Sequence, residues 1–367
     1  MKPTSPYLSV IVPAHNGERV LPRSLAALYA STLPREAWEL IVVDDASNDR
    51  TDVVAAEFAD TVIRLSGKPH GPAYARNRGF EVSRGEVIVF VDADVCVHTG
   101  TLAQFAAIFA KQSDVGAVFG SYDVNPPAQG FVSQYRNLLH HYHHQINAGD
   151  AQTFWAGCGA IRADVFLAAD MYDEWHFWRP QIEDIELGNR IHALGHRILL
   201  RPEIQCAHLK RWTLRGMLVA DLKDRGLPWA RLLVAQGSAL KSKALNLKTQ
   251  EKICTALVWG MLLLIVAALI FDERILAFAA LLSVTTVIVV NRPLYAFFER
   301  VRGFWFALGV IPLHVLYYGL NGIAAGYGWF LHELLGGPVP DPTVEAFAEV
   351  GLKTWPPVPV KRNSGWW

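Results

Sequence analysis

Three apolar stretches without charged residues occupy much of the C-terminal third of the chain, and they constrain its fold more than any other feature. A helix of about 20 apolar residues is long enough to cross the hydrocarbon core of a bilayer. The stretch 253–271 is about that long, and the stretch 275–290 is shorter. The stretch 304–331 is longer and is interrupted by Pro312. We therefore predict three transmembrane helices at these positions. The alternative is a buried helical core.

The residues around these stretches indicate how the chain meets the membrane. Residues 213–252 are rich in Lys, Arg and Trp, which favours an interfacial segment over a surface helix with a linker. Cationic residues precede the first and third predicted spans, and by the positive-inside rule they keep the preceding domain in the cytoplasm. We expect a multi-pass protein of a bacterial inner membrane or a plasma membrane. Three spans would place the Pro-rich tail, 332–367, on the far side.

The first part of the chain, 1–212, alternates short apolar runs with helical segments. The stretches LSVIVP, ELIVVDD, TVIRL and VIVFV are typical of strands, and apolar residues recur at helical spacing within 19–32. Strands that alternate with helices predict an α/β fold with a mostly parallel sheet. Lys plus Arg equals Asp plus Glu, at 34 each, so the overall charge gives no indication of nucleic-acid binding.

Two carboxylates follow the fourth predicted strand with one residue between them. Asp92 and Asp94 stand where a central strand ends, and ligands bind at such ends in open α/β sheets. Their hard oxygen atoms suit a divalent cation such as Mg²⁺ or Mn²⁺, which can neutralise a diphosphate and make it a better leaving group. The pair by itself is also compatible with an ordinary turn at the end of a strand.

Other motifs follow the neighbouring strands. After the second strand, Asp45 in DDAS has the position of a carboxylate that binds a base or a ribose, although capping of a helix is an equally physical role. Arg76 lies in a stretch between two glycines that suits a cradle for phosphates. Gly157 has no side chain and would let the backbone approach a sugar closely.

Two further motifs lie near the end of this part of the chain. The stretch EDIEL places Glu183, Asp184 and Glu186 at the start of an amphipathic helix, where an acid would serve as a general base. The alternative is that these acids only complement the helix dipole. His208 follows a short apolar stretch and is either a third metal ligand or a structural histidine.

These motifs, in this order, resemble the family 2 glycosyltransferases with the GT-A fold. The resemblance covers about residues 8–215 and rests on VIVPAHNGE, VVDDASNDRT, ARNRG, FVDADV, the loop around Gly157, EDIELGNR and His208. It implies a Rossmann-like GT-A domain that takes a nucleotide-sugar donor and inverts the anomeric centre of the sugar, followed here by transmembrane helices. The roles it implies are nucleotide-sugar binding by Pro13, Ala14, Glu18, Asp45, Arg76, Asp92 and Gly157, metal binding by Asp94, Asp92 and His208, and general-base catalysis by Asp184 with Glu183 in the acceptor site.

One departure concerns the processive members of this family, which carry a QxxRW motif. In HLKRW, His208 stands where Gln would, while Arg211 and Trp212 are kept. This difference favours transfer of a single sugar over extrusion of a polymer. A membrane-attached, non-processive member of the family implies a lipid as the acceptor.

Two other readings of the chain stay open at this point. In the first, Asp92 is the nucleophile of a haloacid-dehalogenase-like phosphatase. In the second, the protein binds or transports a ligand without catalysis, although the predicted spans hold no charge of the kind that favours transport. The run NLLHHYHHQ also places His140, His143 and His144 on one helical face. For that face we favour an acceptor contact or a polar surface over a second metal site.

Overall fold

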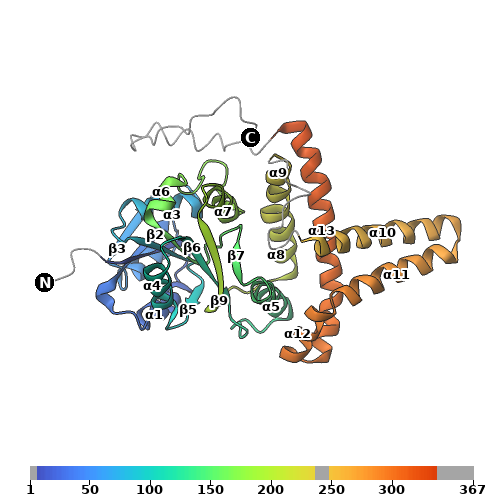
Figure 1. Ribbon diagram of the computed structural model, residues 1–367, viewed down its shortest axis with the longest axis horizontal. Coiled ribbons are helices and arrows are strands. Elements are labelled where there is room, and N and C mark those ends of the chain that lie inside the picture. Colours follow the sequence, from blue (N-terminus) through green and yellow to red (C-terminus); the bar gives the residue numbers. More distant parts are fainter. Residues whose placement is uncertain (1–5, 236–247, 337–367) are drawn as a thin grey trace. The chain divides into compact units, whose positions relative to one another are not determined.

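The computed structural model describes residues 6–235 and 248–336 (Figure 1). Contacts within the chain divide it into two compact units, with the change between Arg211 and Trp212. The first unit carries the alternating strands and helices, and the second carries the apolar helices. Each unit is described by itself below.

One sheet of nine strands organises the first unit. Eight strands follow the order β3-β2-β1-β4-β8-β6-β9-β5, and β7 pairs with β9. The four strands predicted from the sequence are all present, as β1 to β4, and their mutual pairings are parallel. The strands are β1 (Leu8–Ala14), β2 (Trp38–Asp45), β3 (Thr61–Leu65), β4 (Val87–Val91), β5 (Val95–Val97), β6 (Val115–Tyr122), β7 (Gly149–Ala151), β8 (Cys158–Arg162) and β9 (Arg197–His208).

The sheet is mixed beyond β4. β8 inserts antiparallel between β4 and β6, β6 pairs parallel with β9, and β5 and β7 pair antiparallel with β9. The predicted parallel arrangement is therefore present in β1 to β4, whereas the other strands add both parallel and antiparallel pairs. The helical elements of this unit are α1 (Leu21–Tyr29), the 3₁₀ turn η1 (Arg35–Ala37), α2 (Thr51–Ala56), α3 (Pro72–Glu81), α4 (Thr101–Lys111), α5 (Phe131–Gln145), α6 (Ala163–Ala168) and α7 (Glu183–Ala193).

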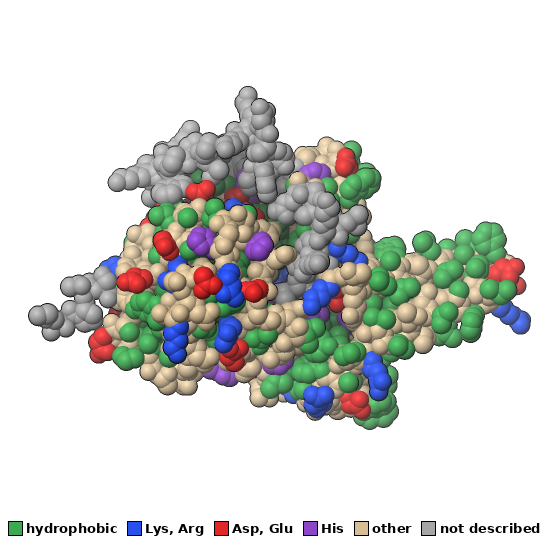
Figure 2. Space-filling model, viewed as in Figure 1, with side chains coloured by type: hydrophobic (Ala, Val, Ile, Leu, Met, Phe, Trp, Pro, Cys, Tyr) green, Lys and Arg blue, Asp and Glu red, His purple; other side chains and the backbone are tan. Residues whose placement is uncertain are grey.

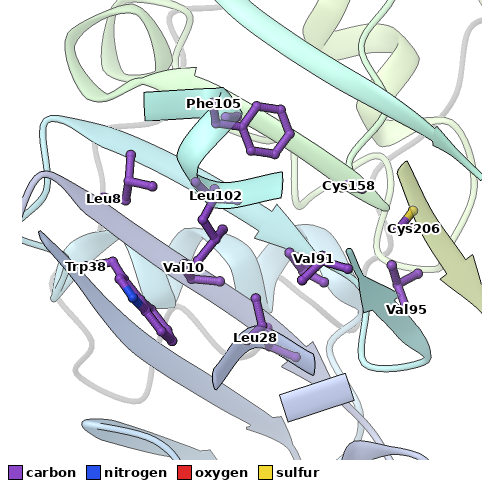
Figure 3. Packing of buried hydrophobic residues seen from close by; sticks show 14 of the residues in the cluster. Leu8, Val10, Leu28, Trp38, Val91, Val95, Leu102, Phe105, Cys158 and Cys206 are labelled. Carbon is purple, nitrogen blue, oxygen red and sulfur yellow. The ribbon is translucent and has the colours of Figure 1, made fainter. Parts of the chain in front are cut away.

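The hydrophobic core lies against the central strands (Figure 3). All five residues of β4 are fully buried, as a continuous apolar run predicts for a strand covered on both faces. Val91 ends this strand and pairs with Cys158 of β8. Because β4 is fixed on both sides, the two carboxylates that follow it start from a rigid position. Leu102 and Phe105 of α4 belong to the same core cluster.

The second unit consists of helices. The predicted interfacial segment is helical as far as it is described, over 214–235, and 236–247 lie outside the described residues. The elements are α8 (Leu214–Val219), the π-helix η2 (Ala220–Gly226), α9 (Leu227–Ala235), α10 (Thr249–Phe271), α11 (Arg274–Val290), α12 (Arg292–Arg302) and α13 (Phe304–Leu335).

Two of these helices, α10 and α13, are each long and apolar enough to cross a membrane. A third crossing is possible if α11 and α12 form one span. The two helices meet at a bend of 62° and are long and apolar enough only when taken together. The cationic residues predicted to precede the third span lie in α12. α13 continues to Leu335, so the first residues assigned to the tail are helical, while 337–367 lie outside the described residues.

α10 and α11 form a helical hairpin whose far end is exposed (Figures 1 and 2). Leu269 is 80% exposed and Ile275 is 77% exposed, although both side chains are apolar. Near the other end of the hairpin, Val258 and Val287 pack on Tyr318 of α13. Such exposure of apolar side chains on a two-helix hairpin is compatible with lipid and is costly in water. Figure 2 shows acidic and basic side chains at the tip, where Asp272, Glu273 and Arg274 join the two helices.

Candidate active site

The predicted metal ligands Asp94 and His208 lie next to each other. His208 Nε2 is 3.4 Å from Asp94 Oδ2, and Leu209 N donates to Asp94 O at 2.8 Å. The pairing of β5 with β9 causes this approach, because Val95 is the register partner of His208. Burial raises the pKa of Asp94, but the hydrogen bond and charge of His208, with the charge of Lys210, hold it below its ordinary value. Asp94 is therefore a carboxylate at neutral pH.

This pair fits one divalent cation. Two donor atoms bound at about 2.0–2.2 Å to one ion lie about 3 Å apart, close to the separation observed here. A carboxylate oxygen and an imidazole nitrogen are both ligands that Mn²⁺ accepts. Among the described residues no group of three or more His, Cys, Asp and Glu side chains could hold a metal. An ion at Asp94 and His208 would therefore need further ligands from water or from a diphosphate.

Arg76 joins the first carboxylate of the DxD motif to the EDIEL motif. Its guanidinium donates to Asp92 Oδ1 at 2.8 Å and to Glu183 Oε1 at 3.0 Å, and it lies 5.3 Å from the centre of the Tyr172 ring. Burial alone would lower the pKa of Arg76. The neighbouring Tyr172, Asp92, Glu183 and Asp184 have the larger, opposite effect, so the pKa lies above its ordinary value and the side chain is always charged. The sequence placed Arg76 near phosphates, whereas here two carboxylates bind it.

The acids of the EDIEL motif begin α7, as predicted, and they differ in their surroundings. Glu183 is buried and accepts from Gln181 N at 2.9 Å as well as from Arg76. Asp184 is half-buried and accepts from Ala156 N at 3.3 Å. Glu186 is buried and binds Arg190 through both oxygens at 2.7 Å. Asp184 is the least buried of the three, so an acceptor hydroxyl can reach it more readily than Glu183 or Glu186, which favours it as a base.

Asp45 ends β2 and anchors the start of α3. Its oxygens accept from His70 N at 2.8 and 3.0 Å and from Gly71 N at 2.7 Å. Gly71 has a φ of +94°, and a Cβ on it would lie 1.8 Å from Trp178 O. Asp45 therefore holds a turn that only glycine fits. These bonds agree with the helix-capping alternative. An ionised carboxylate has further acceptor sites, so the contact of Asp45 with a base or a ribose stays a prediction.

The loop after β1 is tied to the loop after β2. Pro13 and Ala14 lie in β1, in register with β2. Glu18 Oε2 accepts from Arg50 N at 3.3 Å, and Glu18 N donates to Asp49 Oδ2 at 3.1 Å. These bonds make one surface of the two loops at the carboxyl ends of adjacent parallel strands, which is where nucleotides bind in α/β folds.

Gly157 packs closely against its own chain, and its approach to a sugar stays a prediction. Its carbonyl accepts from Asp92 N at 3.2 Å, and a Cβ on it would lie 2.5 Å from the Trp155 indole. The space that glycine provides is thus occupied by a side chain of the same chain. The backbone of Gly157 holds the start of the DxD turn, and its small size allows Trp155 to pack beside Tyr122, with ring centroids 4.8 Å apart.

Comparison with known proteins identifies this part of the chain. The family model described as glycosyl transferase family 2 matches residues 9–168. The chain carries a family 2 glycosyltransferase domain. It is 29% identical over 207 residues to the probable glycosyltransferase YdaM of Bacillus subtilis, covering 54% of this chain and 49% of that protein. It is 38% identical over 132 residues to the dolichyl-phosphate beta-glucosyltransferase ALG5D of Trichomonas vaginalis, covering 32% of this chain and 40% of that protein.

The fold of this domain is of GT-A type. A solved mannosyltransferase, PcManGT from Pyrobaculum calidifontis, in complex with GDP-Man and Mn²⁺, superposes with a TM-score of 0.51 at 17% identity and covers 87% of each chain. The chain spans about half the length, or less, of the curated relatives it matches. The phosphatase and the non-catalytic alternatives are set aside by the family match, and Asp92, the supposed nucleophile, is bound to Arg76.

Proposed function

We propose that this glycosyltransferase transfers one sugar from a nucleoside diphosphate sugar to a lipid acceptor with inversion of the anomeric centre. The observation that carries the proposal is the gathering of Asp94 with His208, and of Asp92 with Glu183 through Arg76, near the ends of β4 and β9. A cation site for a diphosphate and a half-buried carboxylate for an acceptor hydroxyl therefore stand in one domain.

Asp94 and His208 would hold Mg²⁺ or Mn²⁺ on the donor side. When bound, the cation supplies positive charge that stabilises a departing diphosphate. The end of β1, with Pro13 and Ala14, and the joined loops that contain Glu18 would border the nucleoside, with Asp45 using its remaining lone pairs. Arg76 and Asp92 would keep the donor and acceptor sides in register, because the guanidinium already links Asp92 to Glu183. Gly157 supports this arrangement through its backbone.

Asp184 would act as the general base. It removes the proton from the acceptor hydroxyl while that oxygen attacks the anomeric carbon and the nucleoside diphosphate leaves from the opposite face. This single displacement inverts the anomeric centre. Glu183 would orient the acceptor, since its own carboxylate is held by Arg76 and by Gln181 N and is less free to take up a proton.

The acceptor is proposed to be a lipid because the same chain carries helices able to cross a membrane, and because one relative is named a dolichyl-phosphate glucosyltransferase. With spans at α10, at α11 with α12 and at α13, the cationic residues before the first span would keep the glycosyltransferase domain in the cytoplasm. Under this topology the tip of the α10–α11 hairpin and the tail face the other side.

Cysteine labelling of the intact membrane tests the topology. A cysteine at Asp114, whose side chain is 59% exposed, should react only from the cytoplasmic side, and cysteines at Glu273 and Trp366 only from the opposite side. If positions 273 and 366 react from different sides, the number of spans is even and the proposed third crossing is wrong.

Sugar transfer itself is tested by incubating the full chain with a panel of radiolabelled nucleotide sugars and a membrane lipid extract. We expect one donor to give labelled lipid in the presence of Mn²⁺ or Mg²⁺, with loss of the product in EDTA and in Asp94→Ala. A matched control is Asp114→Ala, which removes an exposed carboxylate that pairs with Arg197. Undiminished transfer by Asp94→Ala in EDTA would refute the metal assignment.

A further inference from the structure

The histidine-rich run of α5 holds that helix against the sheet. His141 Nδ1 is 2.7 Å from Tyr122 O, and His144 Nδ1 is 3.0 Å from Gly120 O. A carbonyl oxygen only accepts, so both ring nitrogens donate. Both histidines are buried, and Gly120 and Tyr122 belong to β6. The run therefore fixes α5 to the strand that neighbours β9, whose last residue is His208.

Asn137 begins this run, and its side chain reaches His208. It is 1% exposed, its Oδ1 lies 3.0 Å from His208 Nδ1, and its Nδ2 donates to Ser133 O at 3.0 Å. The second bond decides the orientation of the amide. If the amide were reversed, its oxygen would face the Ser133 carbonyl, and two acceptors would oppose each other. Asn137 Oδ1 therefore faces His208, and His208 Nδ1 donates to it.

This bond determines which nitrogen of His208 is free to bind a cation. With the proton on Nδ1, the lone pair of the neutral imidazole lies on Nε2, and Nε2 is the nitrogen that faces Asp94. The ring plane is fixed as well, because His208 stacks on Tyr122 with a centroid distance of 4.6 Å and an interplanar angle of 6°. Metal-binding histidines in proteins generally donate their other N–H to such a partner.

We propose that Asn137 is a positioning residue that holds His208 in the tautomer and orientation required to bind the divalent cation. This inference rests on the proposed cation site at Asp94 and His208. Asn137 touches neither the donor nor the acceptor in this account, and it acts only through the imidazole.

The test measures cation binding instead of turnover. Mn²⁺ is titrated into the full chain in detergent with inorganic diphosphate present, and free Mn²⁺ is followed by electron paramagnetic resonance. Asn137→Leu should weaken Mn²⁺ binding by about 10–100-fold, as loss of such a partner does in other metal sites. Asn137→Asp should bind Mn²⁺ within a few-fold of the wild type, because a carboxylate oxygen still accepts from His208 Nδ1.

Gln134→Leu provides the matched control. Gln134 is a buried amide on the same helix that donates to Ala128 O at 2.7 Å, so its loss tests the effect of removing any buried amide from α5. We expect this variant to lose stability and to keep its Mn²⁺ affinity. A purely structural role for Asn137 predicts instead that affinity follows thermal stability across all three variants, and that result would overturn the inference.

The same titration separates this inference from the proposed function. If Asp94→Ala and His208→Ala lose Mn²⁺ while Asn137→Leu binds it like the wild type, only the role of Asn137 is wrong. If Asp94→Ala and His208→Ala also bind Mn²⁺ normally, the cation site itself is wrong.

Discussion

Replacement of Arg76, whose buried guanidinium binds two carboxylates, should lower the stability of the fold. Arg76→Met keeps much of the side-chain volume but leaves two carboxylates without their cation. The side chain of Glu183 is 7% exposed and that of Asp92 is 35% exposed, so most of the cost falls on Glu183. Loss of one partner from a buried ion pair costs about 3–5 kcal/mol, while the partly exposed pair adds little because water screens it. We expect destabilisation of about 3–5 kcal/mol.

A double-mutant cycle isolates this effect. Arg76→Met, Glu183→Gln and the double variant are unfolded by denaturant as full chains in detergent, with tryptophan fluorescence as the signal. The double variant should lose about 2 kcal/mol less than the sum of the single losses, because it removes both members of the buried pair, whereas each single variant leaves one charge unpaired there. Arg201→Met is the control, since Arg201 pairs with Glu203 at the surface and should change stability by about 0.5 kcal/mol or less. Additive losses, or a loss below about 1 kcal/mol in Arg76→Met, would refute the reasoning.

Three further predictions follow from neighbouring contacts. Glu183→Gln should raise the apparent KM for the acceptor more than it lowers turnover, as steady-state kinetics would reveal. Burial lowers the pKa of His144 in the folded protein to about 3. As the pH falls, the unfolded chain therefore binds a proton at His144 before the folded chain does. This histidine should lower the free energy of unfolding by about 1.4 kcal/mol between pH 7.5 and 5.5. That share of the pH dependence should vanish in His144→Gln and persist in His143→Gln. Gly71→Ala should lower the melting temperature, because its Cβ would collide with Trp178 O.

The first four strands, and the position of Asp92 and Asp94 at the end of β4, were predictable from the sequence. Buried strands have a clear apolar pattern, and residues that follow them, such as Asp92 and Asp94, come to the same edge of a parallel sheet. The antiparallel insertion of β8 was not predictable in this way. Its sequence, Cys158–Arg162, is short and contains Gly159, so it lacks the long apolar run that predicts a buried strand.

Side-chain partners were less predictable than positions. The sequence brought Arg76 to the site as a basic residue, but its two acidic partners lie 16 and 107 residues away, and only tertiary packing unites them. Asp45 was predicted to meet a base, whereas its oxygens hold the backbone of His70 and Gly71. Asn137 had no signal of its own, since a single helical asparagine is compatible with many contacts.

The most direct test of the account concerns Asp184. Donor affinity and single-turnover transfer to lipid are measured side by side on the wild type and on Asp184→Asn, using the donor that the nucleotide-sugar panel identifies. A general base acts on the acceptor in the transition state, so we predict a loss of transfer of about 10²–10⁴-fold with donor affinity nearly unchanged. An acid that only complements the helix dipole predicts a stability loss of about 0.3–1 kcal/mol with transfer intact. Transfer within a few-fold of the wild type would contradict the central claim.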